Sequence, residues 1–267
     1  MSVSAISGKG AKAGFTPGSV CLVGAGPGDP ELLTLKAVNR MAQAEIVFCD
    51  RLVADDIRAF VNPDARQVYV GKSKGEHSVP QEEIHERLIA AARSGKRVMR
   101  LKGGDPFIFG RGGEEVEALR LAGISTEVIP GITSALGCAA SQEIPLTHRG
   151  LAQAVTFVTG HARLGEAPDL DWAALARGNQ TVVVFMGVGA APMIADRLIA
   201  AGRAADAPVA AIENGTRADE KTVHGTLGDL ATLLADNDIT GPALLIIGEV
   251  ATLGKGALKN IIQEAQA

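Results

Sequence analysis

The feature that most constrains the fold is a buried-strand pattern that runs directly into a glycine turn at residues 20–30 (VCLVGAGPGDP). An apolar strand that ends in a G-x-G turn is typical of α/β proteins that bind nucleotides at their strand ends. A dinucleotide-binding loop has a third glycine and opens directly into a helix, but here Asp29 occupies that third position. Pro27 and Pro30 restrict the residues before them to extended conformations, so we expect the next helix to begin no earlier than about Pro30.

Asp29 also indicates which ligand this wide loop can accept. Its carboxylate is placed to cap the following helix, where it would repel the pyrophosphate of a dinucleotide. A cationic or zwitterionic ligand therefore fits better. A second strand pattern at residues 45–50 ends in Asp50, roughly where a nicotinamide enzyme holds its ribose hydroxyl. An NAD-dependent dehydrogenase thus stays an alternative, although the missing third glycine disfavours it.

The composition is that of an ordinary soluble protein. The chain has 267 residues, of which 46% are hydrophobic and 21% charged, so it can bury a large core in one large or two medium domains. A net charge of −4 argues against a broad nucleic-acid-binding face. Residues 1–16 lack the apolar segment of a signal peptide, and no later run reaches the roughly 18 apolar residues of a membrane span. We therefore expect a cytoplasmic protein without nucleic-acid or membrane partners.

The cysteines and histidines give no sign of a disulfide framework or a metal site. Cys21, Cys49 and Cys138 lie in apolar runs without a C-x-x-C pair, so we expect buried, reduced thiols. The five histidines lack the spacing of metal ligands, and no metal is expected.

Strand-like and helix-like patterns alternate along the chain. The predicted strands are 19–23, 45–49, 66–70, 97–101, 125–129, 154–158, 181–186, 207–212, 221–225 and 243–248. The predicted helices are 31–43, 81–94, 113–122, 132–141, 171–176, 190–201 and 227–235. In the first half, near-continuous apolar strands in this arrangement predict a largely parallel α/β sheet covered on both faces.

A turn-rich segment at residues 143–150 marks the junction between two such sets of elements. We predict two α/β domains that meet near residues 135–150, with a ligand cleft at their junction. The predicted boundaries are a flexible tail at 1–16, an N-terminal domain at 17–135, a C-terminal domain at 136–255 and a C-terminal tail at 256–267.

Two further loops follow strand patterns and carry candidate ligand-binding residues. Residues 98–115 form a strand and then a loop with five glycines, more than a simple strand-to-helix turn needs. Glycines at the carboxyl end of a strand let the backbone approach a ligand closely. In residues 128–135, the hydroxyls of Thr133 and Ser134 could cap a helix or bind a ligand. We expect the ligand site where these loops meet the first glycine turn.

Three segments, in this order and spacing, resemble the tetrapyrrole (corrin/porphyrin) methylase family. They are residues 23–37 (VGAGPGDPELLTLKA), 103–106 (GGDP) and 130–134 (PGITS). Shorter segments that are similar to the same family are 48–53 (FCDRLV), 70–72 (VGK) and 145–150 (PLTHRG). The likeness covers about residues 18–254.

The resemblance implies two α/β domains with a trough between them that holds S-adenosylmethionine, and a homodimer. It implies two successive methylations of uroporphyrinogen III to precorrin-2 by way of precorrin-1, in sirohaem or cobalamin biosynthesis. A methylase of a later precorrin on the same scaffold is an alternative. The chain does not carry the dehydrogenase/chelatase extension of some relatives, so a single activity is expected.

The family's cofactor contacts carry over by motif to residues in both predicted domains. In the first they fall on Pro27, Gly103, Gly104, Asp105, Ile108, Thr133 and Ser134. In the second, where the motifs are less distinctive, they fall on Met186, Gly215 and Ala243. The product left by methyl transfer would be S-adenosylhomocysteine.

The family's proposed proton acceptor falls on Asp50 and its proposed proton donor on Lys72. From the residues alone, Asp50 could equally cap the turn that follows its strand. The substrate carries many carboxylates, which bind well to arginine. The candidate cations are Arg51, Lys72, Lys74, Lys102, Arg111, His148, Arg149 and Arg163, all in predicted loops.

Overall fold

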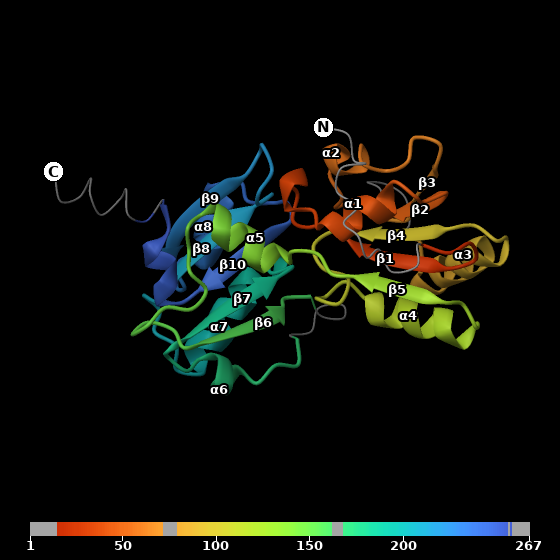
Figure 1. Ribbon diagram of the computed structural model, residues 1–267. Helices are drawn as coiled ribbons and strands as arrows, with labels where there is room; N and C mark the ends of the chain where they lie inside the picture. The colour runs from red at the N-terminus through yellow and green to blue at the C-terminus, as the bar shows by residue number, and fades with distance from the viewer. Residues whose placement is uncertain (1–14, 72–78, 162–167, 256, 258–267) are drawn as a thin grey trace. The chain divides into compact units, whose positions relative to one another are not determined.

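The computed structural model describes residues 15–71, 79–161, 168–255 and 257 (Figure 1). The chain divides into two compact units, residues 1–133 and 134–267. The division lies two residues before the predicted domain boundary. Each unit has its own five-stranded sheet, and the predicted α/β class is therefore confirmed.

The sheet of the first unit is entirely parallel. Its strands are β1 (Val20–Gly24), β2 (Ile46–Cys49), β3 (Arg66–Tyr69), β4 (Val98–Lys102) and β5 (Thr126–Ile129), in the spatial order β3-β2-β4-β1-β5. β1 and β4 are buried at every position. Burial along both strands fits a parallel sheet that is covered on both faces, and of the two strands only β4 carries charged residues, Arg100 and Lys102.

Helices cover both faces of this sheet. They are α1 (Leu35–Met41), α2 (Asp55–Arg58), α3 (Gln81–Arg93) and α4 (Gly112–Leu121). α1 packs with Cys21 and Val23 of β1 in one apolar cluster, whereas α3 and α4 pack with Val20 and Leu22 in the other. Successive strand residues point to opposite faces, so one strand serves both clusters.

The predicted helix at 31–43 is broken in the structure. Pro30–Leu32 form a single 3₁₀ turn, and α1 begins only at Leu35. The Asp29 carboxylate accepts a hydrogen bond from the Glu31 N–H (2.8 Å), so it caps the 3₁₀ turn. The hydroxyl of Thr34 accepts from the Ala37 N–H (3.1 Å) and caps α1. A second cap within five residues therefore separates the two segments, and α2, which has four residues, was not predicted at all.

The sheet of the second unit is mixed. Its strands are β6 (Ala154–Thr159), β7 (Gln180–Phe185), β8 (Pro208–Glu213), β9 (Lys221–Thr226) and β10 (Ala243–Ile247), in the order β6-β7-β10-β8-β9. β6 pairs with β7 in parallel, and the other three pairs are antiparallel.

Helices also cover both faces of the second sheet. They are α5 (Ser134–Ser141), α6 (Trp172–Leu175), α7 (Ala191–Ala200) and α8 (Leu230–Asp236), with 3₁₀ turns at Val188–Ala190 and Glu249–Leu253. α7 and α8 share one apolar cluster with β7 and β8. α5 and the turn at Glu249–Leu253 share the other.

The structure also tests the predicted N-terminal tail and the predicted buried thiols. Phe15, which the prediction placed in the tail, is buried in the core of the first unit. Cys21, Cys49 and Cys138 are all free and buried. Burial raises the pKa of the three thiols to about 12, about 11 and about 12 respectively, as expected of inert cysteines. No helix in the described part of the chain is long and apolar enough to cross a membrane.

Candidate functional site

The loops that follow β1 and β4 meet at the carboxyl edge of the first sheet. Gly26 and Gly104 exchange backbone hydrogen bonds: the Gly104 N–H donates to the Gly26 carbonyl (2.7 Å) and the Gly26 N–H donates to the Gly104 carbonyl (3.2 Å). β1 continues through α1 to β2, and β4 continues through α4 to β5, so the chain leaves these neighbouring strands in opposite directions. Such a switch point is where open α/β sheets bind ligands.

The loop after β5 joins the same edge through glycine contacts. A Cβ built on Gly24 would lie 2.4 Å from the Gly131 nitrogen and 2.7 Å from the Gly104 oxygen. A Cβ on Gly131 would lie 2.2 Å from the Gly104 oxygen. Backbone atoms cannot move aside cheaply, so Gly24 and Gly131 need to be glycine. The three loops singled out from the sequence are therefore packed together.

The glycines of the loop at residues 103–113 are largely needed for its own packing. A Cβ on Gly110 or Gly112 would lie 2.8 Å or 2.4 Å from the Pro106 oxygen, and Gly104 has a φ of 64°. A Cβ at Gly113, by contrast, would meet nothing within 4 Å. The loop therefore has one glycine that its geometry does not require, Gly113, whereas Gly104, Gly110 and Gly112 are explained by the backbone conformation and by the fold of the loop onto Pro106.

Asp105 holds two of these loops in place. Its Oδ2 accepts a hydrogen bond from the Gly131 N–H (3.1 Å), and its Oδ1 accepts from the Phe107 N–H (2.9 Å). Ile108 is 36% exposed between two exposed phenylalanines, while Pro27 is buried. Thr133 is buried at the end of the first unit, and Ser134 begins α5. The structure thus places Pro27, Gly103, Gly104 and Asp105 at the loops of this one edge, and their contacts with a cofactor stay predictions.

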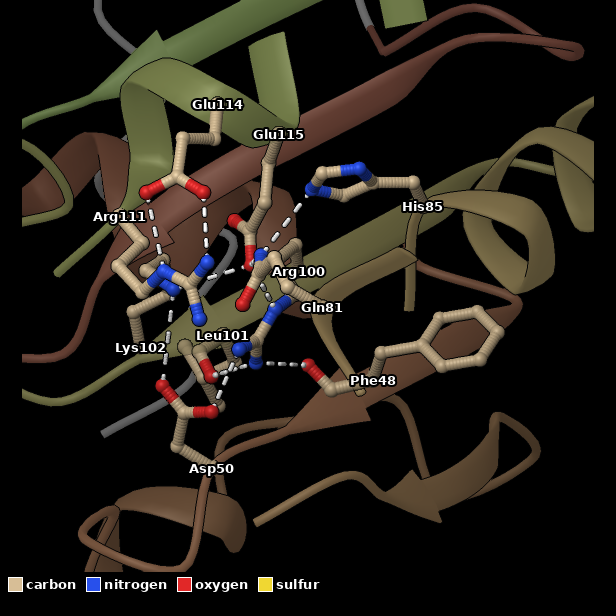
Figure 2. Close-up of polar contacts among 10 residues, drawn as sticks. All are labelled: Phe48, Asp50, Gln81, His85, Arg100, Leu101, Lys102, Arg111, Glu114 and Glu115. Atoms are coloured by element: carbon tan, nitrogen blue, oxygen red, sulfur yellow. Dashed lines mark hydrogen bonds and ion pairs between the residues drawn. The ribbon is translucent and has the colours of Figure 1, made fainter. Parts of the chain in front are cut away.

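A buried charged cluster lies beside this edge, on the sheet face that α3 and α4 cover (Figure 2). Arg100 and Lys102 of β4 are 2% and 3% exposed, and Glu115 of α4 is 0% exposed. Glu115 Oε1 accepts hydrogen bonds from Arg100 Nε (2.9 Å) and Lys102 Nζ (3.1 Å). Asp50, directly after β2, receives Arg100 Nη2 on Oδ1 (2.5 Å) and has Lys102 Nζ 3.8 Å from Oδ2.

The two cations respond differently to this environment. Burial and the neighbouring Arg100 lower the pKa of Lys102, and Asp50 and Glu115 only partly compensate. Burial alone would lower the pKa of Arg100 as well, but Asp50 and Glu115 raise it overall. Two cations and two carboxylates balance in charge, which is the condition for burying such groups.

The cluster corrects one expectation and adds residues that sequence reasoning missed. Lys102 was expected in a loop as a ligand for substrate carboxylates, but it is the last residue of β4 and is ion-paired inside the unit. Arg100 and Glu115 were not predicted. The available signal was the alternation of Arg100 and Lys102 in an otherwise apolar strand, which places both on one face and demands buried partners there.

Of the remaining predicted cations, which include the predicted proton donor Lys72, three lie outside the described residues and four are exposed. Lys72, Lys74 and Arg163 lie outside the described residues. Arg111 is exposed and pairs with Glu114 through two contacts of 2.9 Å and 2.7 Å. Arg51, His148 and Arg149 are exposed. Their roles toward a substrate stay predictions.

The three residues predicted in the second unit lie together at one edge of its sheet. Met186 follows β7, Gly215 follows β8, and Ala243 begins β10 between those strands. Ala243 is opposite Glu213 in the register, and Leu244 is opposite Phe185. Because β10 runs antiparallel to both neighbours, its start coincides with their ends.

The backbone at this edge is strained. Met186, Asn214 and Thr216 have φ values of 54°, 51° and 67°, in the left-handed region that non-glycine residues rarely adopt. For a β-branched residue such as Thr216 this conformation is a genuine outlier, and outliers of this kind cluster at ligand sites. Glu220 supports the segment by accepting hydrogen bonds from the Thr216 N–H and from Gln142, just after α5.

No metal site accompanies these features in the described ranges, where no group of three or more His, Cys, Asp or Glu side chains could hold an ion.

Known proteins are similar to this chain in sequence and in fold. The chain is 52% identical over 239 residues to a siroheme synthase of Pseudomonas fluorescens, covering 90% of this chain and 51% of that protein. A Klebsiella pneumoniae siroheme synthase is 55% identical over 236 residues, covering 88% and 51%. The chain thus spans about half the length of the curated relatives that it matches.

Two solved structures match nearly along their whole length. Uroporphyrin-III C-methyltransferase of Thermus thermophilus, complexed with S-adenosylhomocysteine, is 45% identical with a TM-score of 0.76, covering 88% of this chain and 99% of that one. A cobalt precorrin-4 methyltransferase is 30% identical with a TM-score of 0.78, covering 88% and 96%. The profile of the tetrapyrrole (corrin/porphyrin) methylases matches residues 19–231. The chain therefore belongs to the tetrapyrrole (corrin/porphyrin) methylase family.

Proposed function

We propose that this protein is an S-adenosylmethionine-dependent C-methyltransferase that converts uroporphyrinogen III into precorrin-2 by way of precorrin-1. The observation that carries the proposal is the edge formed by the loops after β1, β4 and β5, in a chain that is 45% identical to the Thermus enzyme. This reaction would serve sirohaem or cobalamin synthesis.

The charge of this edge fits a sulfonium cofactor. The loops at residues 25–33, 103–110 and 130–133 carry three charged side chains, Asp29, Glu31 and Asp105, and all three are acidic. An anionic pyrophosphate would meet repulsion here, whereas a ligand with a positive sulfur and an ammonium group would be attracted. The same observation disfavours the dehydrogenase alternative.

Binding and alignment are the main tasks of these loops. When bound, S-adenosylmethionine supplies a methyl group that its positive sulfur already activates. The backbone of Gly103 and Gly104, the Asp105 carboxylate and the Ile108 side chain would hold it at the switch point. Correct alignment of two reactants can lower the barrier by roughly 7–11 kcal/mol in favourable cases, so no covalent nucleophile is required.

Asp50 is the member of the charged cluster that is suited to remove a proton. After the substrate carbon bonds to the methyl group, the substrate must lose one proton. The Asp50 side chain is 27% exposed, whereas those of Arg100, Lys102 and Glu115 are at most 4% exposed. We propose Asp50 as the general base and Lys72 as the proton donor, together with Thr133, Ser134, Met186, Gly215 and Ala243 as further cofactor contacts.

Assembly and location belong to the same proposal. We propose a cytoplasmic homodimer, as the family resemblance implies; light scattering of the purified protein tests the dimer.

The experiment compares methyl acceptors. The purified protein is incubated without oxygen with methyl-labelled S-adenosylmethionine and either uroporphyrinogen III or precorrin-2. Incorporation of label into uroporphyrinogen III supports the proposal. Label found only in precorrin-2 would instead make the protein a methylase of a later precorrin. The likeness to the cobalt precorrin-4 methyltransferase is the observation that favours this alternative.

A further inference from the structure

Glu115 is an unusual residue to find with no exposure to solvent. It lies in the first turn of α4 and is 0% exposed, although glutamate is almost never fully buried unless it is paired. Its Oε1 accepts hydrogen bonds from Arg100 Nε (2.9 Å), Lys102 Nζ (3.1 Å) and Gln81 Nε2 (3.2 Å). Its Oε2 has no hydrogen-bond partner among the described residues. The hydrogen bonds that the described residues donate to Glu115 are thus concentrated on one oxygen.

Both cations that pair with Glu115 also face the carboxylate of Asp50. Arg100 Nη2 lies 2.5 Å from Asp50 Oδ1, and Lys102 Nζ lies 3.8 Å from Asp50 Oδ2. Each oxygen of Asp50 therefore faces a different cation. Both cations also donate a hydrogen bond to Glu115 Oε1 (Figure 2). The hydrogen bond from Arg100 and the longer ion pair with Lys102 together restrict the orientation of the Asp50 carboxylate.

The guanidinium group of Arg100 is fixed further by the sheet. Its Nη1 donates to the backbone carbonyls of Phe48 and Leu101, each at 3.3 Å. Arg100 thus connects β2, β4 and α4 and cannot follow Asp50 if that carboxylate moves.

The other ionisable groups on this side of the unit are less directly placed. From α3, His85 contacts Gln81 at 3.2 Å, and Gln81 contacts Glu115. From the start of α4, Glu114 pairs with Arg111 near the surface. The two cations are therefore the direct link between Glu115 and Asp50.

We propose that Glu115 is a positioning residue that sets the orientation of the Asp50 carboxylate through Arg100 and Lys102. The inference rests on the proposed function, because Asp50 is there the group that takes the proton from the methylated substrate. Glu115 itself reaches no reactant. It acts by balancing the charge of Lys102 and by holding both cations against Asp50.

The decisive variant is Glu115→Gln, which keeps the shape but removes the charge. The amide can no longer balance two cations, so positive charge remains beside Asp50 and the cluster rearranges. We expect kcat to fall about tenfold or more, because a misplaced reacting group lowers the rate by up to about 10²-fold per ångström. We expect KM for S-adenosylmethionine and the calorimetric affinity for S-adenosylhomocysteine to be unchanged. The surplus positive charge makes the cluster bind protons less readily, so the acidic limb of the kcat–pH profile moves to lower pH.

Two further variants make the test specific. Glu117→Gln makes the same change at an exposed position of the same helix and is expected to behave as wild type. Lys102→Met combined with Glu115→Gln removes one cation together with the anion, which leaves Arg100 and Asp50 balanced. We expect this double variant to fold and to have a higher kcat than Glu115→Gln alone, or a measurable kcat if the single variant does not fold by circular dichroism.

The outcomes separate this inference from the proposed function. A wild-type protein that methylates no tetrapyrrole would overturn the proposed function. An active wild type with unchanged kcat and pH profile in Glu115→Gln would overturn the positioning role alone. A double variant no more active than Glu115→Gln would also overturn it, because Glu115 would then not act through Lys102.

Discussion

The sulfur atom of Cys138 occupies the space that a side chain at Gly215 would need. A Cβ built on Gly215 would lie 2.2 Å from Cys138 Sγ and 3.2 Å from Cys138 Cβ. The contact fixes the distance between α5, which begins at Ser134, and the segment after β8, so it joins two predicted cofactor-binding segments within one unit.

Gly215→Ala is expected to destabilise the second unit because the new methyl group overlaps the buried sulfur. The expected loss is about 1–3 kcal/mol of the free energy of unfolding, the usual range for overpacking. Urea denaturation measures this loss. Adding Cys138→Ala removes the sulfur and should restore most of the stability. A double variant as unstable as Gly215→Ala would show that the sulfur is not what excludes a side chain.

Gly131→Ala is expected to abolish binding of S-adenosylhomocysteine. Its Cβ would lie 2.2 Å from the Gly104 oxygen and 2.8 Å from the Gly24 Cα, so the three loops must separate and the hydrogen bond from Gly131 N–H to Asp105 is lost. Calorimetry measures the affinity. Gly178→Ala, where a Cβ meets nothing within 4 Å, is the matched control. Wild-type affinity in Gly131→Ala would remove these loops from the cofactor site.

Asp50→Asn is expected to lower turnover far more than cofactor affinity. The amide cannot take up the proton that the substrate loses, and a general base typically contributes about 10²–10⁴-fold to the rate. We expect kcat to fall about 100-fold or more with an unchanged calorimetric affinity for S-adenosylhomocysteine. Wild-type turnover would mean that Asp50 is not the general base and that its carboxylate only pairs with Arg100 and Lys102.

Glu127→Gln is expected to destabilise the first unit only above acidic pH. The hydrogen bond from Arg40 is the main cause that holds the pKa of Glu127 below its usual range, with a further contribution from Lys36, while burial opposes both. This stabilisation is therefore present above the unfolded-state pKa and is lost as the pH falls through the lower folded-state pKa.

The Glu127 side chain is 32% exposed, so solvent screening limits the expected loss to about 1 kcal/mol at neutral pH. Urea denaturation at neutral pH and at a pH below the folded-state pKa measures the difference, with exposed Glu117→Gln as the control. An equal loss at both pH values would contradict the prediction, because it could not come from the ionised carboxylate.

The loops at the strand ends of the first unit were predictable because their backbone conformation depends on residues that are adjacent in the sequence. The segment at residues 20–30 shows an apolar strand, glycines and prolines, and each of these has a direct conformational meaning. The break before α1 was missed because Thr34 is a cap only once the chain has turned at Leu33.

The charged cluster could not be predicted in the same way. Arg100 and Glu115 are fifteen positions apart, and their pairing depends on how α4 packs on β4. Lys102 was taken for a loop cation because its strand extends one residue further than predicted. Tertiary packing determines which charged residues form ion pairs in the core, and a local sequence pattern does not identify the partner of each residue.

The most direct test of the proposed activity is the mass of the tetrapyrrole formed when the protein is incubated without oxygen with uroporphyrinogen III and S-adenosylmethionine. We predict a product that has gained two methyl groups, with a transient species that has gained one. A substrate of unchanged mass, in the presence of a protein that calorimetry shows to bind S-adenosylhomocysteine, would contradict uroporphyrinogen III as the substrate.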